Sequence, residues 1–270
     1  AKAEVYNYGP SVLKNAQINW SITNSEGKTL KSGKMKSRTI GKDGVFPLDS
    51  FSYALNSITE PQKLTVHLSV AHVQNSWDIW VYPRHDNPMQ STDKVLYTNV
   101  FDEKAKQYLA DGKKVVLCPK PSKVKGRKSV FHNHFWNPIM FKWAPMTIGC
   151  LIHDDQPVFD HFITSYHTDW QWWDILENAK VIEMKDAPAE LRPFIQVIDR
   201  YDNNEKLGIG FEAKVNKGSL LVLAVDTQKN IKERPATQQL LESIDIYVKS
   251  DKFNPQIAVE ESYIESFLNK

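Results

Sequence analysis

The fold of most of the chain is decided by the stretch KVLYTNVFDEKAKQYLADGKKVVLCP, residues Lys94–Pro119. Two short apolar runs enclose a polar segment in which Phe101, Ala105 and Leu109 fall on one helical face. Gly112 follows as a suitable end for the helix. A strand, an amphipathic helix and a second strand at this spacing predict a βαβ unit, whose two strands run parallel. The stretch therefore predicts an α/β domain with a mostly parallel sheet.

The residues that follow add strands and helices to this domain. The runs FIQVIDRY and KLGIGFEAKV, joined by a turn that contains asparagine, predict a strand pair, and SLLVLAVDT predicts a buried strand. The segment PATQQLLESIDIYVKS predicts a helix, because Pro235 suits a first turn and Leu240, Ile244 and Val248 share one side. The run VEESYIESFLNK predicts another short helix.

Before Lys94 the pattern is that of strands alone. Ile18, Trp20 and Ile22 alternate with polar residues in AQINWSITN, and the turn SEGK leads into TLKSGKMKS, which predicts a hairpin. The same alternation recurs in KLTVHLSVAH, and WDIWVYPR closes the region. Short alternating strands joined by Gly, Pro, Asn and Asp turns predict an antiparallel immunoglobulin-like sandwich.

The polar sequence HDNPMQSTD separates the two patterns. We therefore expect an immunoglobulin-like β-sandwich over residues 1–83, a linker over 84–93 and an α/β domain over 94–270. Because the sequence opens almost inside the strand-like run AEVYNY, we also expect the chain to be the end of a longer protein.

Composition and charge argue against several classes of protein. With 41% hydrophobic and 24% charged residues, the 270-residue chain has the composition of a folded globular protein. Its 34 basic and 32 acidic residues leave a net charge of +2, so no broad field favours nucleic acid or an anionic membrane. The longest fully apolar run, Leu220–Val225, is far too short to cross a bilayer. We expect neither a nucleic-acid partner nor a membrane partner.

The segment DHFITSYHTDWQWWDILE, residues Asp160–Glu177, mixes aromatic rings with hydrogen-bonding groups. Tryptophan rings beside such groups suit a flat polar ligand such as a sugar. The alternative is that the tryptophans pack in the core where a strand leads into a helix. The candidate ligand-binding residues are Trp136, His167, Asp169, Trp170, Trp172 and Asp226. Asp226 ends a buried run, where it would either border a cleft or cap a loop.

No residue stands out as catalytic. Hydrolysis of a glycosidic bond usually needs two carboxylates at a fixed separation, and no strand end presents such a pair. The dipeptide Asn204–Glu205 lies in YDNNEKLG, which is typical of a hairpin turn. Cys118 is followed by prolines and lacks the glycine elbow of a nucleophile, whereas Cys150 sits within a strand-like run.

Metal-binding patterns are also weak. The two cysteines form neither a disulfide framework nor a zinc signature. His132 and His134 are two residues apart, and His161 or His167 could complete a site with them, but no third ligand stands at a definite spacing. We predict no metal and no cofactor, and we interpret these histidines as solvated or hydrogen-bonded.

Several segments together carry a resemblance to a known family. They are WDIWVYP at 77–83, FWNPIMF at 135–141, HFITSYHTDWQWWDILENAK at 161–180, LRPFIQVIDRYDNNEKLGIGFEAKVNKGSLLVLAVD at 191–226 and VKSDKFNP at 248–255. These segments are similar to the C-terminal region of glycoside hydrolase family 2 (beta-galactosidase-like) proteins from gut Bacteroidetes. The resemblance extends over nearly the whole chain.

The resemblance implies an immunoglobulin-like sandwich followed by a flavodoxin-like domain similar to class I glutamine amidotransferases. A catalytic TIM barrel of about 250 residues does not fit here. The two catalytic glutamates of the family therefore have no counterpart, and the amidotransferase elbow is missing. The resemblance implies a periplasmic or cell-surface, non-catalytic accessory segment that supports the catalytic domain of the same parent protein or a homo-oligomer.

Two alternative functions remain open from the sequence. One is a carbohydrate-binding module that uses the tryptophan-rich segment to hold an oligosaccharide. The other is an amidotransferase- or esterase-like hydrolase that uses Cys118 or a histidine and aspartate pair in the α/β cleft.

Overall fold

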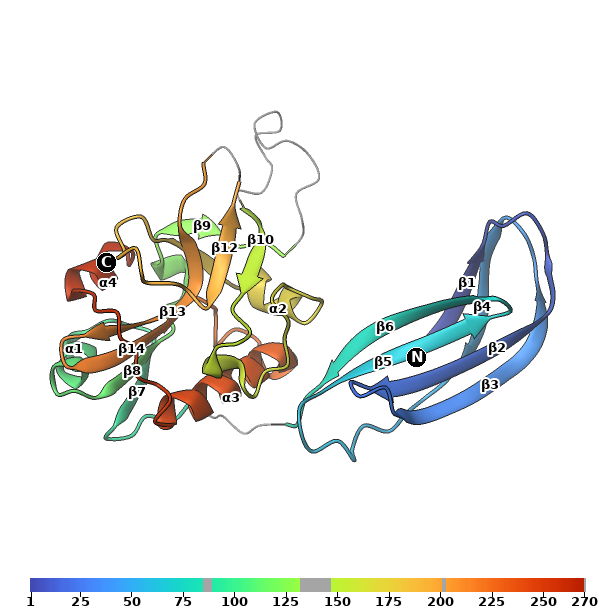
Figure 1. Ribbon diagram of the computed structural model, residues 1–270, viewed down its shortest axis with the longest axis horizontal. Coiled ribbons are helices and arrows are strands. Elements are labelled where there is room, and N and C mark those ends of the chain that lie inside the picture. Colours follow the sequence, from blue (N-terminus) through green and yellow to red (C-terminus); the bar gives the residue numbers. More distant parts are fainter. Residues whose placement is uncertain (85–88, 132–146, 201–202, 270) are drawn as a thin grey trace. The chain divides into compact units, whose positions relative to one another are not determined.

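The computed structural model describes residues 1–84, 89–131, 147–200 and 203–269. The chain divides into two compact units, Ala1–Pro83 and Arg84–Lys270 (Figure 1). Strands alone make up the regular structure of the first unit, whereas the described residues of the second unit combine strands with helices. No helix in the described residues combines the length and the apolar character that crossing a membrane requires.

The first unit is a β-sandwich of two sheets. Its six strands are β1 Lys2–Asn7, β2 Leu13–Asn24, β3 Thr29–Ile40, β4 Gly44–Ser50, β5 Gln62–Val70 and β6 Val73–Val81. One antiparallel sheet has the order β3-β2-β5-β6, and the other contains only β1 and β4. Ile18, Leu68 and Val70 of the larger sheet form a core with Val5 and Phe46 of the smaller one.

The hairpin predicted from the alternating sequence is present in this unit. β2 and β3 pair antiparallel, and Gly27 in the intervening turn has a φ of 78°. Glycine adopts this left-handed conformation without the steric cost that a side chain brings. Ile18 and Ile22 point into the core as the alternation predicts.

The second unit contains a mixed sheet and four α-helices in its described residues. Its elements are β7 Val95–Thr98, α1 Glu103–Ala110, β8 Lys114–Leu117, η1 Pro121–Lys123, β9 Gly126–Lys128, β10 Thr147–Ile152, η2 Pro157–Phe159, α2 Trp172–Glu177, β11 Lys180–Glu183, β12 Ile195–Asp199, β13 Leu207–Val215, β14 Gly218–Leu223, η3 Ile231–Glu233, α3 Pro235–Lys249 and α4 Glu261–Ser266. The βαβ prediction is confirmed, since β7 and β8 pair parallel and α1 lies between them in sequence. Gly112, with a φ of 77°, follows the end of α1.

The expectation of a mostly parallel sheet is wrong. Among the described residues the main strand order is β10-β12-β13-β14-β8-β7, and only the β14–β8 and β8–β7 pairs are parallel. The other pairs of this sheet are antiparallel. The physical reason is the length of the connections. Few residues separate β12 from β13 and β13 from β14 in the sequence, and a strand that returns after so short a connection runs antiparallel.

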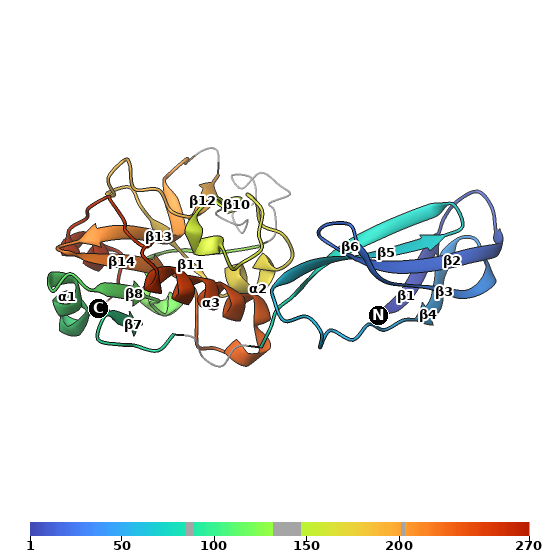
Figure 2. The same ribbon diagram turned by 60° about the horizontal axis from the view of Figure 1, so that its bottom comes forward.

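Helices pack on both faces of this sheet. Phe211 and Ala213 of β13 share a core with Leu109 of α1 and with α4. Glu212 points to the opposite face, because neighbouring side chains of a strand alternate, and it accepts a hydrogen bond from Tyr247 of α3. Thus α1 and α4 cover one face of the sheet and α3 covers the other. Figure 2 shows these helices and strands from a second direction.

Candidate functional site

The tryptophan-rich segment contains one ring that is wholly buried. Trp172, the first residue of α2, is 0% exposed. Its ring meets Phe159 and Phe162 edge-on, with centroids 6.2 and 5.3 Å away. Its Nε1 donates to Oγ1 of Thr164 at 2.9 Å. Trp172 therefore belongs to the core and offers no ring face to a ligand.

Two other tryptophans of the segment lie at the surface. Trp170 is 75% exposed, and its ring centroid lies 5.4 Å from that of Phe131 at an interplanar angle of 40°. Trp173 is also exposed. Within this segment, one tryptophan therefore packs in the core while its two neighbours face solvent.

The side chains of the remaining described candidate ligand residues each contact a residue close to them in the sequence. His167 is exposed, with its ring against Tyr166 at 4.7 Å. Asp169 accepts hydrogen bonds from the backbone and side chain of Gln171 at 3.3 and 3.2 Å. Asp226 accepts from the backbone N–H groups of residues 228 and 229, both at 2.9 Å, which is the loop-capping alternative. Trp136 lies outside the described residues.

A buried arginine fixes α2 against α3. Arg234 is 4% exposed, and its Nε donates to Oδ1 of Asp174 in α2 at 2.7 Å. Thr237 of α3 donates to Oδ2 of the same carboxylate at 2.7 Å. These charge-assisted bonds lock the short helix that carries Trp172 and Trp173.

The two cysteines are placed as structural residues. Cys118 and Cys150 are free thiols and both are buried. Burial raises the pKa of each thiol to about 12. Because the thiolate is the nucleophilic form, neither thiol is prepared for attack near neutral pH.

Glu205 belongs to a cluster of carboxylates around Arg127. The guanidinium contacts Glu183 at 3.1 Å and Asp199 at 2.5 Å, and it also pairs with Glu205. Burial opposes ionisation of Asp199, but hydrogen bonds from Asn203 and from two backbone N–H groups, with the charge of Arg127, hold its pKa below the ordinary value. This cluster ties the β12–β13 turn to β9, so Glu205 has a structural partner.

A small cavity in the second unit contains a partly buried carboxyl group. Glu212, Tyr247, His153 and Arg192 help to line this cavity of about 320 Å³. Tyr247 donates to Oε2 of Glu212 at 2.8 Å. Burial raises the pKa of Glu212, although the Tyr247 hydrogen bond acts in the opposite direction.

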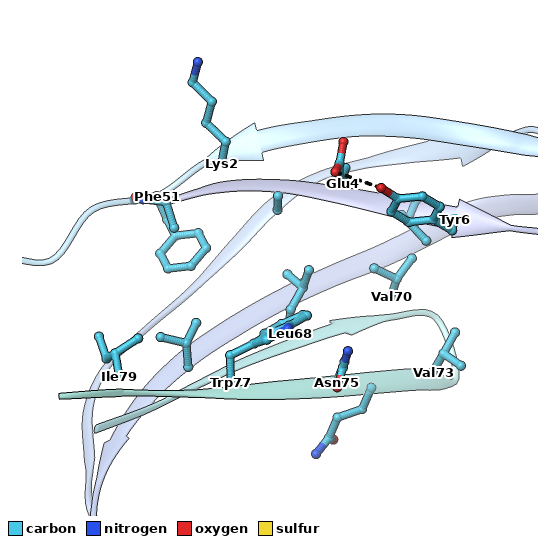
Figure 3. Close-up of a pocket in the computed structure, with 15 residues that line it drawn as sticks. Lys2, Glu4, Tyr6, Phe51, Leu68, Val70, Val73, Asn75, Trp77 and Ile79 are labelled. Atoms are coloured by element: carbon cyan, nitrogen blue, oxygen red, sulfur yellow. Dashed lines mark hydrogen bonds between the residues drawn. The ribbon is translucent and has the colours of Figure 1, made fainter. Parts of the chain in front are cut away.

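A larger cavity than this one lies in the first unit. This groove, of about 690 Å³, is bordered by β1 on one side and by β5 and β6 on the other (Figure 3). Its floor and walls are mainly apolar and include Val66, Leu68, Val70, Trp77 and Ile79. We call this cavity the β1–β6 groove.

The apolar floor of the β1–β6 groove is uncovered along most of β6. Val73 and Trp77 are 51% and 48% exposed, although both side chains point to the same face as the buried Val81. Residues 73–78 are exposed on both faces of the strand. The smaller sheet is too narrow to cover them, because β1 is its last strand and β4 lies toward β3.

The pairing of β1 with β4 leaves the other edge of β1 free. The amino group of Ala1 donates to the carbonyl of Phe51 at 2.7 Å, and the N–H of Phe51 donates to the carbonyl of Ala1 at 3.0 Å. Successive residues of a strand direct their backbone groups to opposite edges, and the register shift near Lys2 places its extra residue on β4. The N–H and C=O groups of Lys2, Glu4 and Tyr6 therefore face away from β4.

Pro47 supports this assignment. It lies opposite Glu4 in the register of β1 and β4, and it has no N–H with which to form a hydrogen-bonded pair. Its carbonyl accepts a hydrogen bond from Arg38 of β3 at 3.3 Å, on the side away from β1. In the described residues β6 pairs only with β5, so an unpaired strand edge borders the groove on each side.

Sequence reasoning missed this groove. The alternation in WDIWVYPR predicts a strand, but it does not tell whether another layer covers Trp77. The number of strands that would have indicated an incomplete layer, six in residues 1–83, is known only from the structure.

Two family models match the chain, each over one unit. Residues 96–269 match the family described as Domain of unknown function (DUF8487), and residues 1–83 match Domain of unknown function (DUF8488). The first match covers more than half of the chain, so the chain belongs to the DUF8487 family. No curated protein matches the chain.

Proposed function

We propose that this chain is a non-catalytic accessory segment of a larger carbohydrate-degrading enzyme of the glycoside hydrolase family 2 type, where it supports the catalytic domain by binding its polypeptide. The observation that carries the proposal is the β1–β6 groove, in which Val73 and Trp77 expose apolar surface between two unpaired strand edges. An apolar patch with a polar rim is typical of an interface with another polypeptide.

The placement of the reactive groups favours an accessory role over catalysis. The thiols of Cys118 and Cys150 are buried with raised pKa values. The groove is lined by the ionisable side chains of Lys2, Glu4 and Tyr6 in β1. These three side chains point away from the core of the sandwich. A periplasmic or cell-surface location, and a homo-oligomeric parent enzyme, belong to the same proposal.

The finer fold assignments belong to this proposal as well. The sandwich of the first unit is of immunoglobulin-like type, with a four-stranded sheet facing a narrower one. The parallel strands β14, β8 and β7, with α1 between the last two in sequence, support descent of the second unit from a flavodoxin-like domain. Its antiparallel strands would then be later additions to that parallel part.

Binding of an oligosaccharide is a second candidate function. The observation in its favour is the exposed ring of Trp170 beside Phe131. Intrinsic tryptophan fluorescence titrated with plant-wall and host oligosaccharides tests it. A saturable shift that Trp170→Ala abolishes and Trp173→Ala leaves unchanged supports a site at Trp170, and a flat response across the panel removes this candidate.

The accessory proposal is tested by comparing three proteins: the full polypeptide that the gene encodes, this 270-residue chain, and the remainder without it. Each is assayed on a panel of nitrophenyl glycosides, nitrophenyl esters and glutamine. We expect glycoside hydrolysis by the full polypeptide, none by this chain, and a lower thermal midpoint for the remainder alone. Turnover of any substrate by this chain contradicts the proposal.

A further inference from the structure

We propose that the β1–β6 groove receives one additional β-strand, which pairs with the free edge of β1 and covers β6. The inference rests on the accessory function proposed above and names its partner, an extended segment of the larger enzyme that lies outside these 270 residues. The groove, the two unpaired edges and the exposed apolar floor carry it together.

The strand count supports a missing neighbour of β1. The sandwich has sheets of four and two strands, whereas constant-type immunoglobulin sandwiches have about seven strands divided into four and three. One strand added beside β1 makes the narrow sheet three strands wide. It would then lie over β6, where residues 73–78 are exposed on both faces.

The backbone of β1 determines how such a strand would bind. The N–H and C=O groups of Lys2, Glu4 and Tyr6 face the open edge, as the β1–β4 register and the Pro47 carbonyl indicate. An extended peptide that adds to a sheet edge obtains its affinity from main-chain hydrogen bonds of this kind. An edge with unpaired backbone groups therefore selects a strand over a helix or a small molecule.

The side chains determine the sequence pattern of the partner. Every second residue of the added strand must be apolar, because it would contact Leu68, Trp77 and Ile79. The intervening residues would lie beside Lys2 and Glu4, which point outward from β1. An acidic residue opposite Lys2 and a basic residue opposite Glu4 complete the match, since opposite charges across strands are favourable.

A second copy of the chain does not satisfy these requirements. If its β1 paired with the first β1, the inward side chains Ala3 and Val5 of the second copy would still be packed on their own core. The same side chains cannot also cover Trp77 of the first copy. The groove therefore fits a strand that brings no second layer of its own.

The probe for this inference is a fluorescein-labelled peptide of sequence TIKVEIT, which alternates apolar and polar residues and carries the two charges in antiparallel register with Lys2 and Glu4. The control peptide, TKIVIET, has the same composition without the alternation. Fluorescence anisotropy with the full chain should show saturable binding of the first peptide and at least about tenfold weaker binding of the second.

Two variants of the chain test the two halves of the contact. Trp77→Ala removes the largest exposed ring of the floor and should weaken the alternating peptide about tenfold or more. Glu4→Pro removes a backbone donor at the free edge while the β1–β4 pairing remains possible, and it should also weaken binding. The matched variant Glu4→Ala retains the N–H group and should bind within about threefold of the unmodified chain.

The outcomes separate this inference from the function on which it rests. If this chain binds the remainder of the enzyme but Trp77→Ala and Glu4→Pro bind it equally well, strand addition is refuted and the accessory role survives. If neither the alternating peptide nor the remainder binds, both proposals fail. Concentration-dependent dimerisation that Trp77→Ala abolishes would assign the groove to a second copy and would also refute the inference.

Discussion

Replacement of Trp172 by alanine should strongly destabilise the second unit. The side chain is fully buried, touches Phe159 and Phe162 edge-on, and donates a hydrogen bond to Thr164. Truncation of a buried tryptophan to alanine costs about 3–5 kcal/mol, because transfer energy is lost and a cavity remains. The lost indole N–H adds about 1 kcal/mol. Such a loss is a large part of the roughly 5–15 kcal/mol by which domains are stable.

Urea unfolding of the full chain, followed by hydrogen-exchange mass spectrometry, measures this loss separately for each unit. Trp170→Ala is the matched control, since this ring is 75% exposed and its removal should cost about 1 kcal/mol or less. Trp172→Phe should fall between the two variants, because it retains a ring but loses the donor to Thr164. Equal losses for Trp172→Ala and Trp170→Ala would refute the division of the segment into a core ring and a surface ring.

Three further predictions concern the buried polar groups of the second unit. Arg234→Met should cost about 3 kcal/mol in urea unfolding, because it leaves the Asp174 carboxylate without its guanidinium; a cost below about 1 kcal/mol would show that the pair is not important. Burial raises the pKa of Glu212 in the folded state. The contribution of Glu212 to stability is therefore largest at low pH and is lost as the pH rises. Glu212→Gln should consequently stabilise the protein more at about pH 8 than at about pH 4. Glu233→Gln, at an exposed position, serves as its control, and an equal pH dependence for both variants contradicts the burial argument. Alkylation of the two buried cysteines by iodoacetamide should be slow in the native protein at about pH 8 and fast in urea, and rapid native labelling would contradict their burial.

Local sequence patterns predict much of the regular structure. The alternation around Ile18 and Ile22 predicts the β2–β3 hairpin, and the helical face of Ala105 and Leu109 predicts α1. The expectation of a mostly parallel sheet was wrong because it applied the βαβ rule, which holds for β7 and β8, to strands further along the chain. Turn-forming residues such as Asn216, with a φ of 52°, already indicate a hairpin between β13 and β14.

The candidate sites were harder to predict because they depend on which neighbours cover a side chain. Trp170 and Trp172 are two residues apart, yet one faces solvent and the other the core, and this depends on how α2 docks through Arg234. Trp77 lies on the inward face of its strand and is exposed only because the opposite sheet ends at β1. The width of a sheet is a tertiary property that alternation along one strand does not contain.

The most direct test of the open edge is residue-specific amide exchange, measured by NMR on the unmodified chain. If the edge of β1 is unpaired, the amides of Lys2, Glu4 and Tyr6 exchange at nearly the open-chain rate, while that of Val5, which faces β4, is protected. Equal protection of all four amides would show that the edge of β1 is already paired. The proposal that the β1–β6 groove receives an additional strand would then be wrong.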